Sequence, residues 1–292
     1  MMLLLHVLML SLLSGGSAEV VLHFKDVCDQ FFANGKPPTG FSGVQYRKIC
    51  QKQDNVYYFA TFYDTSNRIP VYSAYVFQGI MGCKRLKNEK FWFIEPQLDD
   101  NNTSPNMQLN KDVSIQGLGN HQALNKDYVN SKYDRGHLAP VYQANSQSCA
   151  YATFTLTNGA PQNPSFNRVQ WNTLEGRIAR KLSNECKLPN KAYIVTGVVP
   201  GTENLNNRVN VPSHFWTAYC CLDNMNISLF SGGFIGKNEK NPPEEKTMND
   251  LKSELANLYH VSSFELFSPA EHQAKKQRIS QNYCFQKQCV IN

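Results

Sequence analysis

Runs of aromatic and β-branched residues, separated by turn-forming segments, impose the strongest constraint on the fold of this chain. Residues 56–63 (VYYFATFY) and 70–77 (PVYSAYVF) are the clearest pair, and the polar segment 64–68 between them is typical of a turn. Because such side chains favour extended backbone, the two runs predict a β-hairpin. Similar runs predict further strands at 91–94, 151–157, 192–199, 215–222 and 227–234.

Helical patterns are confined to a few segments. A helix with one buried face is predicted where apolar residues recur at near-helical intervals, at Val169, Trp171, Leu174, Ile178 and Leu182. A second helix is predicted at 244–259, and the polar segment 96–131 predicts a long connection with one short helix, of a kind that often carries function. Many strands with few β-α-β alternations predict an α+β fold with a central, largely antiparallel sheet flanked by helices.

The first residues resemble a secretory leader. Residues 1–13 are almost wholly apolar and residues 14–18 are small, so 1–18 are predicted to be a signal peptide. The apolar run is short for a membrane span, which needs about 20 residues, and no second run of that length follows. We therefore expect a secreted protein with no stable membrane association after cleavage. Because no repeat or low-complexity linker divides 19–292, we expect a single domain there.

Cysteine usage agrees with secretion. In an oxidising compartment most cysteines should be paired, and an odd number leaves at least one free or bonded to another chain. Their spacing does not indicate the pairing, and none of it is typical of a zinc module. Triplets that begin at Asn101, Asn102 and Asn226 fit N-glycosylation of a secreted protein. The nine cysteines are Cys28, Cys50, Cys83, Cys149, Cys186, Cys220, Cys221, Cys284 and Cys289.

Charge and aromatic content exclude little. The formal charge of +6 and the pI of about 8.7 suit a polyanionic partner. Many secreted proteins that bind no nucleic acid are equally basic, however. The many Phe and Tyr residues mostly follow strand patterns, so core packing explains them better than stacking on bases.

The residues that indicate chemistry lie in two short segments. The first is Asp134-Arg135-Gly136-His137, which in isolation would be an ordinary surface turn. The second begins with Asn158 and Gln162 and continues into the predicted helix with Asn167 and Glu175. Their combination and order make a strong signal where either segment alone would be weak.

Together these segments resemble the DNA/RNA non-specific endonuclease family, which has a ββα-metal active site. The resemblance covers a core at about 56–236, and other segments are similar to the vertebrate endonuclease domain-containing 1 protein group. It implies cleavage of DNA and RNA with Mg²⁺ or Mn²⁺ as cofactor and 5′-phosphate products. It also implies a general base at His137, a metal ligand at Asn167, and further catalytic roles for Asp134, Arg135, Asn158 and Glu175.

The chemistry of these residue types fits phosphodiester hydrolysis. Neutral His137 is a suitable base near pH 7, and Arg135 can form charge-assisted bonds to a phosphate oxygen. Mg²⁺ commonly keeps several waters, so the single amide oxygen of Asn167 can suffice as its protein ligand. Eight residues along a straight helix span about 12 Å, which predicts that Glu175 supports the metal from outside its first ligand sphere.

One position departs from the family, and two other functions stay open. The family often has an arginine four residues after the helix glutamate, where this chain has Ala179, with Arg177 and Arg180 nearby. A catalytically inactive member that binds nucleic acid or protein is the first alternative, although His137 and Asn167 are both present. A phosphodiesterase for small nucleotides is the second.

Overall fold

The structure, a computed structural model, describes residues 20–53, 56–85 and 92–268. The predicted leader at 1–18, Cys284 and Cys289 lie outside these residues. Within the described ranges, none of the helices combines the length and the apolar character that a membrane crossing requires.

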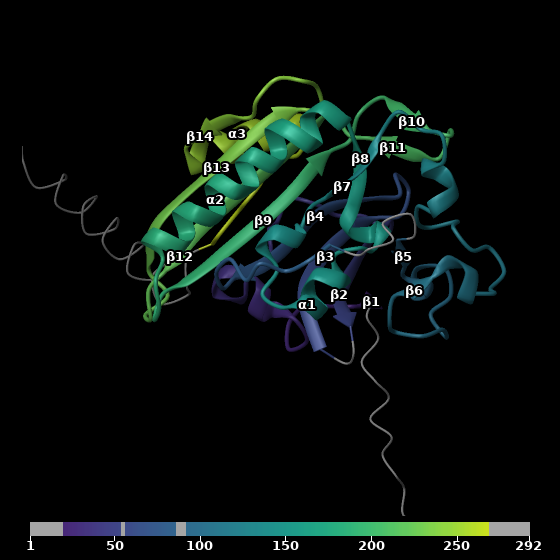
Figure 1. Cartoon of the computed structure of the whole chain (residues 1–292), viewed down its shortest axis with the longest axis horizontal. Coiled ribbons are helices and arrows are strands. Elements are labelled where there is room, and N and C mark those ends of the chain that lie inside the picture. The colour runs from purple at the N-terminus through teal and green to yellow at the C-terminus, as the bar shows by residue number, and fades with distance from the viewer. Residues whose placement is uncertain (1–19, 54–55, 86–91, 269–292) are drawn as a thin grey trace, which may run out of the picture.

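An antiparallel sheet of eight strands forms the centre of the molecule (Figure 1). This confirms the predicted α+β class, the hairpin, and the strands expected at 192–199, 215–222 and 227–234. In spatial order the strands are β1 (Val20–Val21), β2 (Tyr46–Gln53), β3 (Val56–Asp64), β4 (Ile69–Phe77), β9 (Lys191–Val199), β12 (His214–Leu222), β13 (Ser228–Lys237) and β14 (Glu244–Lys246).

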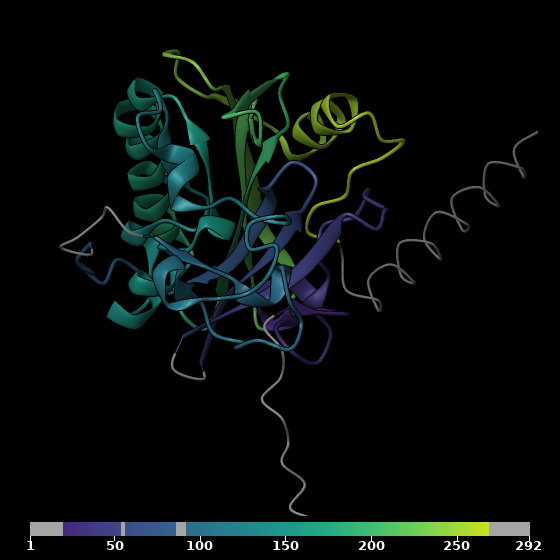
Figure 2. The ribbon, with the colours of Figure 1, turned by 90° about the vertical axis from the view of Figure 1, so that its right-hand side faces the viewer.

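Neighbouring residues of the central strands point into two different hydrophobic cores. Phe215 and Phe234 belong to the core on one face, whereas Trp216 and Ile235 belong to the core on the other. Helix α2 (Asn172–Glu185) covers the first face and α3 (Met248–Leu258) covers the second, so the sheet lies between two layers (Figure 2). Burial of both faces explains why these strand sequences are almost continuously apolar.

Residues 78–190 leave the sheet after β4 and return at β9, although β4 and β9 pair directly, with Tyr72 opposite Gly197. This excursion contains the long polar connection predicted at 96–131, which has three 3₁₀ turns in place of one short helix. Its elements are β5 (Phe93–Ile94), η3 (Pro96–Leu98), β6 (Gln108–Leu109), η4 (Asn110–Asp112), η5 (Asn125–Tyr128), β7 (Asp134–His137), η6 (Val141–Gln143), α1 (Gln147–Ala152), η7 (Leu156–Asn158), β8 (Gly159–Gln162), the π-helical turn η8 (Phe166–Trp171) and α2. Outside the excursion lie η1 (Asp29–Phe31), η2 (Ala33–Gly35) and the hairpin of β10 (Glu203–Leu205) and β11 (Val209–Val211).

The strand predicted at 151–157 is wrong. The hydroxyl of Ser146 accepts a bond from the Cys149 amide and starts α1, which continues to Ala152. A 3₁₀ turn, η7, then follows. Residues 152–157 are all buried. The alternation in their sequence therefore does not separate an inner face from an outer face, as it would in a strand with one exposed side.

The predicted helices are confirmed, but with different starts. Thr247 caps α3 by accepting a bond from the Asp250 amide, so residues 244–246 form the edge strand β14 instead of the first helical turn. In the other helix, Val169 is 56% exposed. It lies in the π-helical turn, whose wider winding directs Val169 away from the buried face that Phe166 and Trp171 form.

Two disulfides stabilise the two halves of the sheet. Cys28 bonds to Cys50 on β2, and Cys186 at the end of α2 bonds to Cys221 on β12. Among the described residues, Cys83, Cys149 and Cys220 are unpaired. The expectation that cysteines pair is therefore met by four of the seven that the structure describes.

Replacing Cys186 and Cys221 together by Ser should lower the free energy of unfolding by about 3–4 kcal/mol, because the bond closes a loop of moderate length in the unfolded chain. Denaturant unfolding of the double variant and the wild type measures this loss. Cys83→Ser, which alters an unpaired and half-buried thiol, is the control and should change stability much less. Equal effects of the two changes would contradict a stabilising role of the disulfide.

Candidate active site

Strands β7 and β8 form a two-stranded antiparallel ribbon that carries both sequence motifs. Its register sets Asp134 opposite Gln162 and His137 opposite Gly159. The helical segment of η8 and α2 follows β8 directly. The ribbon and helix together form the ββα motif predicted between His137 and Glu175.

The glycines of this ribbon are needed for close packing. Gly136 does not have a positive φ, and a Cβ on it would collide with the side chain of Gln162. A Cβ on Gly159 would lie 2.7 Å from the ring of Trp92. Gly136 is therefore needed for close packing against β8 and not for its backbone conformation.

His137 lies at the end of β7 with 8% of its surface exposed. Its ring packs against Trp92 at 4.4 Å and against Phe154 at 4.9 Å between ring centroids. Burial, together with the positive charge of Arg85, lowers the pKa of His137 to about 3. The imidazole is therefore neutral at physiological pH, and among the described residues its buried Nε2 has no hydrogen-bond partner.

Asn167 lies across from β7, in η8. Its amide nitrogen donates to Oδ2 of Asp134 at 2.9 Å. The amide oxygen of Asn163 accepts bonds from the amides of Ser165 and Phe166 at the start of this helical segment. Asn163 thus serves as the cap, which leaves the Asn167 side chain for the site.

Glu175 lies eight residues further along the same helical segment. Burial raises the pKa of its carboxyl group to about 8, and the charge of Arg85 partly opposes this shift. Its backbone carbonyl accepts a bond from the Gln143 amide at 2.8 Å, which ties α2 to η6. The carboxyl group is largely protonated at neutral pH unless a cation lies nearby.

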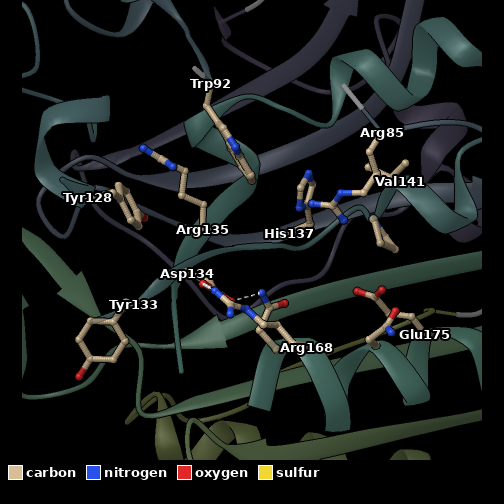
Figure 3. A pocket seen from close by; sticks show the side chains of 13 residues that line it. Arg85, Trp92, Tyr128, Tyr133, Asp134, Arg135, His137, Val141, Arg168 and Glu175 are labelled. Atoms are coloured by element: carbon tan, nitrogen blue, oxygen red, sulfur yellow. Dashed lines mark hydrogen bonds and ion pairs between the residues drawn. The ribbon is translucent and has the colours of Figure 1, made fainter. Parts of the chain in front are cut away.

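These side chains line one cavity of about 630 Å³ (Figure 3). Three arginines, Arg85, Arg135 and Arg168, lie in its wall, with Asp134 and Glu175 as the carboxyl groups. Arginines outnumber carboxyl groups among these described lining residues, which suits a phosphate group.

Arg135 lies in the wall next to Tyr128. Its guanidinium stands 5.0 Å from the centroid of the Tyr128 ring, and Nη2 donates to the backbone carbonyl of Asn125 at 3.5 Å. Burial lowers the pKa of Arg135 from its ordinary value, but an arginine stays charged near neutral pH. Among the described residues, its buried Nε has no hydrogen-bond partner.

Asn158 lies beneath the cavity and does not line it. Its side chain is fully buried, and its amide nitrogen donates to the carbonyls of Ala139 and Thr153 at 3.0 Å each. Its amide oxygen accepts a bond from the Ala139 amide at 2.9 Å. Asn158 therefore supports the backbone directly after His137, and its position is not one for contact with substrate.

Sequence analysis missed several residues that line this cavity, among them Trp92, Tyr128 and Arg168, and Arg85 is the one furthest from the motifs in the chain. It precedes the first motif by many residues in a segment without a strand or helix pattern, so no signal pointed to it. The backbone of its neighbour Lys84 is held by both ends of the Gln147 amide, at 3.0 and 2.8 Å. Figure 3 shows the Arg85 side chain directed toward His137 and Glu175.

The arginines on α2 do not take the place of the missing family arginine at Ala179. Arg177 pairs with Glu245 at 2.6 Å, and Arg180 is exposed. Neither residue lines the cavity, whereas Arg85 does. The cation at this end of the site therefore comes from the segment before β5.

The donor groups fit a hard divalent cation with few protein ligands. Within the described ranges, no cluster of three or more His, Cys, Asp or Glu residues could hold a metal. The amide oxygen of Asn167 accepts no hydrogen bond from these residues, and the carboxyl group of Glu175 lines the same cavity. An amide oxygen and a nearby carboxylate are ligands that Mg²⁺ accepts, with water in the remaining positions.

The sequence matches the family model for DNA/RNA non-specific endonucleases over residues 41–272, so the chain belongs to that family. Endonuclease domain-containing 1 protein of Homo sapiens is 39% identical over 197 residues, which are 66% of this chain and 38% of that protein. Mitochondrial endonuclease G of Homo sapiens is 37% identical over 110 residues, 33% of this chain and 36% of that protein. The chain thus matches less than half of the length of these relatives.

The fold is also similar to that of a solved structure. The crystal structure of the EndoG/EndoGI complex aligns with a TM-score of 0.52, covering 80% of this chain and 89% of that chain. The sequences are 20% identical in this alignment. This likeness concerns the fold alone, and it agrees with the ββα arrangement described above.

His137 should make folding stability depend on pH. Its pKa of about 3 in the folded protein lies below the ordinary value of 6.5, so the unfolded chain binds more protons between these values. Stability is therefore fully present above about pH 6.5 and is lost as the pH falls through this window. Between about pH 7.5 and about pH 5 the expected contribution is about 2 kcal/mol.

Denaturant unfolding at these two pH values tests this dependence. His137→Gln should lose about 2 kcal/mol less on acidification than the wild type. His23→Gln, at an exposed histidine outside the cavity, is the control and should retain the wild-type loss. An unchanged acid loss in His137→Gln would contradict a buried, neutral imidazole in the native state.

Proposed function

We propose that this chain is a metal-dependent endonuclease that hydrolyses phosphodiester bonds of DNA and RNA without reading sequence. The observation that carries the proposal is one cationic cavity in which a neutral imidazole, a positioned amide oxygen and a half-buried carboxyl group meet. Membership of the endonuclease family supports the reaction type.

His137 acts as the general base. The water that attacks phosphorus has to lose a proton, and a neutral imidazole can accept it. A pKa of about 3 alone would make this base weak. The negative charge of a bound phosphate favours the protonated imidazole, however, and raises the pKa toward the range that base catalysis needs.

Asn167 and Glu175 form the metal side of the site. Mg²⁺ or Mn²⁺, when bound, supplies positive charge that stabilises the phosphate oxygens and the leaving alkoxide. Asn167 would hold the ion through its amide oxygen. Glu175, further along the helix, would orient water bound to the ion. Positive charge nearby favours the carboxylate form of Glu175 and so reverses the effect of its burial.

Arg135 and Arg85 bind the phosphate from two sides. The Arg135 guanidinium is steadied by the Tyr128 ring, and Arg85 lies beside His137 and Glu175 (Figure 3). Both are suited to non-bridging phosphate oxygens through charge-assisted bonds. Phosphate contacts carry no sequence information, so cleavage with little base preference is expected.

We also propose that the protein is exported after removal of residues 1–18, is glycosylated, and does not stay attached to a membrane. The two disulfides support an oxidising compartment, because such bonds are rare in the cytosol. The exposed sequon residues Asn101 and Asn226 support glycosylation.

Wild-type protein should nick supercoiled plasmid with Mg²⁺ and stop when EDTA is added. His137→Ala should lower the rate by about 10²–10⁴-fold while the protein stays folded, because the base is lost. His214→Ala is the matched control and should cleave normally. Plasmid binding without nicking by the wild type would favour an inactive binder, and hydrolysis of dinucleotides alone would favour a small-nucleotide phosphodiesterase.

Metal titrations should separate Asn167 from Glu175. Asn167→Ala removes the proposed direct ligand, so the Mg²⁺ requirement should rise steeply or cleavage should vanish. Glu175→Gln keeps the size and removes the charge, and should weaken cleavage by about 10–100-fold in a way that added metal partly restores. The two roles are reversed if Glu175→Gln shows no cleavage at any Mg²⁺ concentration while the cleavage rate of Asn167→Ala depends on Mg²⁺ as that of the wild type does.

Arg85→Ala should reduce the cleavage rate by about 10²–10³-fold, a loss typical of removing one group that stabilises transition-state charge. Arg180→Ala, which changes an exposed arginine of α2 outside the cavity, should stay near the wild-type rate. Rates on one plasmid at saturating Mg²⁺ measure both. A large loss in Arg180→Ala with normal rates in Arg85→Ala would show that α2 supplies the cation after all.

A further inference from the structure

Two consecutive residues of η8 hold the carboxylate of Asp134. The amide nitrogen of Asn167 donates to Oδ2 at 2.9 Å. The Arg168 guanidinium forms a two-pronged pair, from Nε to Oδ2 at 2.8 Å and from Nη2 to Oδ1 at 2.7 Å (Figure 3). Neighbouring side chains on a helix normally diverge, but the wider π-helical turn reduces this divergence, so both reach one carboxylate.

This arrangement decides which end of the Asn167 amide faces the cavity. A side-chain amide has a donor nitrogen and an acceptor oxygen, whereas an ionised carboxylate only accepts. The nitrogen of Asn167 must therefore face Asp134. Its oxygen is left for the cavity, where it accepts no hydrogen bond from the described residues.

Arg168 in turn sets the orientation of Asp134. The torsion that rotates a carboxylate about its last carbon–carbon bond is soft, and a two-pronged guanidinium pair fixes it. Among the described side chains, Arg168 alone donates to Oδ1 of Asp134, so loss of Arg168 would free that oxygen. The same loss would also remove a positive charge beside the proposed cation site, which by itself favours cation binding, so weaker binding would report the loss of geometry.

The ion pair between Arg168 and Asp134 lies too near the surface to add much to folding stability. The Arg168 side chain is 70% exposed, against 18% for Asp134. Ion pairs with an exposed partner add little to folding stability. Its effect is therefore on the geometry of the cavity wall, where Asp134, Asn167 and Arg168 all lie.

We propose that Arg168 is a positioning residue that acts through Asp134 to hold the amide oxygen of Asn167 toward the divalent cation. This inference rests on the proposed metal dependence. Nothing in the sequence pattern assigns a part to Arg168 beyond its place next to Asn167.

Binding of Mn²⁺ to the purified protein without nucleic acid, followed by electron paramagnetic resonance titration, tests the proposal. Arg168→Ala should raise the dissociation constant by about 10–100-fold, as expected when a group behind a metal ligand is lost. Arg168→Lys should give an intermediate value, because an ammonium group cannot form the planar two-pronged pair. Arg177→Ala is the control and should bind as the wild type does, since Arg177 lies further along the same helical segment, in α2, and forms an exposed pair with Glu245 of β14 outside the cavity.

Cleavage kinetics distinguish positioning from direct contact with substrate. If Arg168 positions Asn167, saturating Mn²⁺ should restore most of the rate in Arg168→Ala, with KM for nucleic acid unchanged. Wild-type Mn²⁺ affinity in Arg168→Ala, with a raised KM, would mean that Arg168 binds substrate phosphate, and would overturn this inference while the proposed function stands. A wild-type protein that neither binds Mn²⁺ nor cleaves nucleic acid would overturn both.

Discussion

Direct pairing of β4 with β9 is the interaction on which the rest of this structure depends. Because these strands are neighbours in the sheet, residues 78–190 between them must leave it and return to it. A chain of hydrogen bonds then ties this excursion to the sheet. The Tyr75 hydroxyl on β4 bonds to the Gln143 amide oxygen at 2.7 Å, and the Gln143 nitrogen bonds to the Glu175 carbonyl at 2.8 Å. That connection ties η6, the turn that follows β7, to both the sheet and α2.

Burial shifts the pKa values of the two titratable groups on either side of the cavity in opposite directions. It removes the charge of His137 and also that of Glu175 at neutral pH. Pairs of titratable groups with strongly shifted pKa values are common at catalytic sites, because each group then carries the protonation state that its task needs. A bound phosphate would favour the charged form of His137, and a bound cation would favour the charged form of Glu175. We therefore infer that both groups are charged only when both ligands are bound.

The cationic groups of this cavity come from segments that are far apart in the chain. Ala179 stands where the family often has an arginine, and Arg85 from a distant segment reaches the same cavity. A catalytic site requires a charge at a particular position, and any segment that the fold places there can supply it. Sequence comparison of α2 alone would therefore suggest a loss of function that the cavity itself does not indicate.

The sequence by itself determined the β-hairpin, the central strands, the main helix and the order of the two motifs. These features depend on local side-chain preference and on spacing, which a linear pattern records. The same patterns misplaced a strand at 151–157 and the start of α3, because uniform burial and a capping threonine outweighed the periodicity. Only the tertiary structure decided that Asn158 supports the backbone and that Arg85 enters the cavity. It also decided that Arg168 shares the carboxylate of Asp134 with Asn167. Each of these contacts joins segments far apart in the chain, and which segments meet is set by strand pairing and packing, which local spacing does not encode.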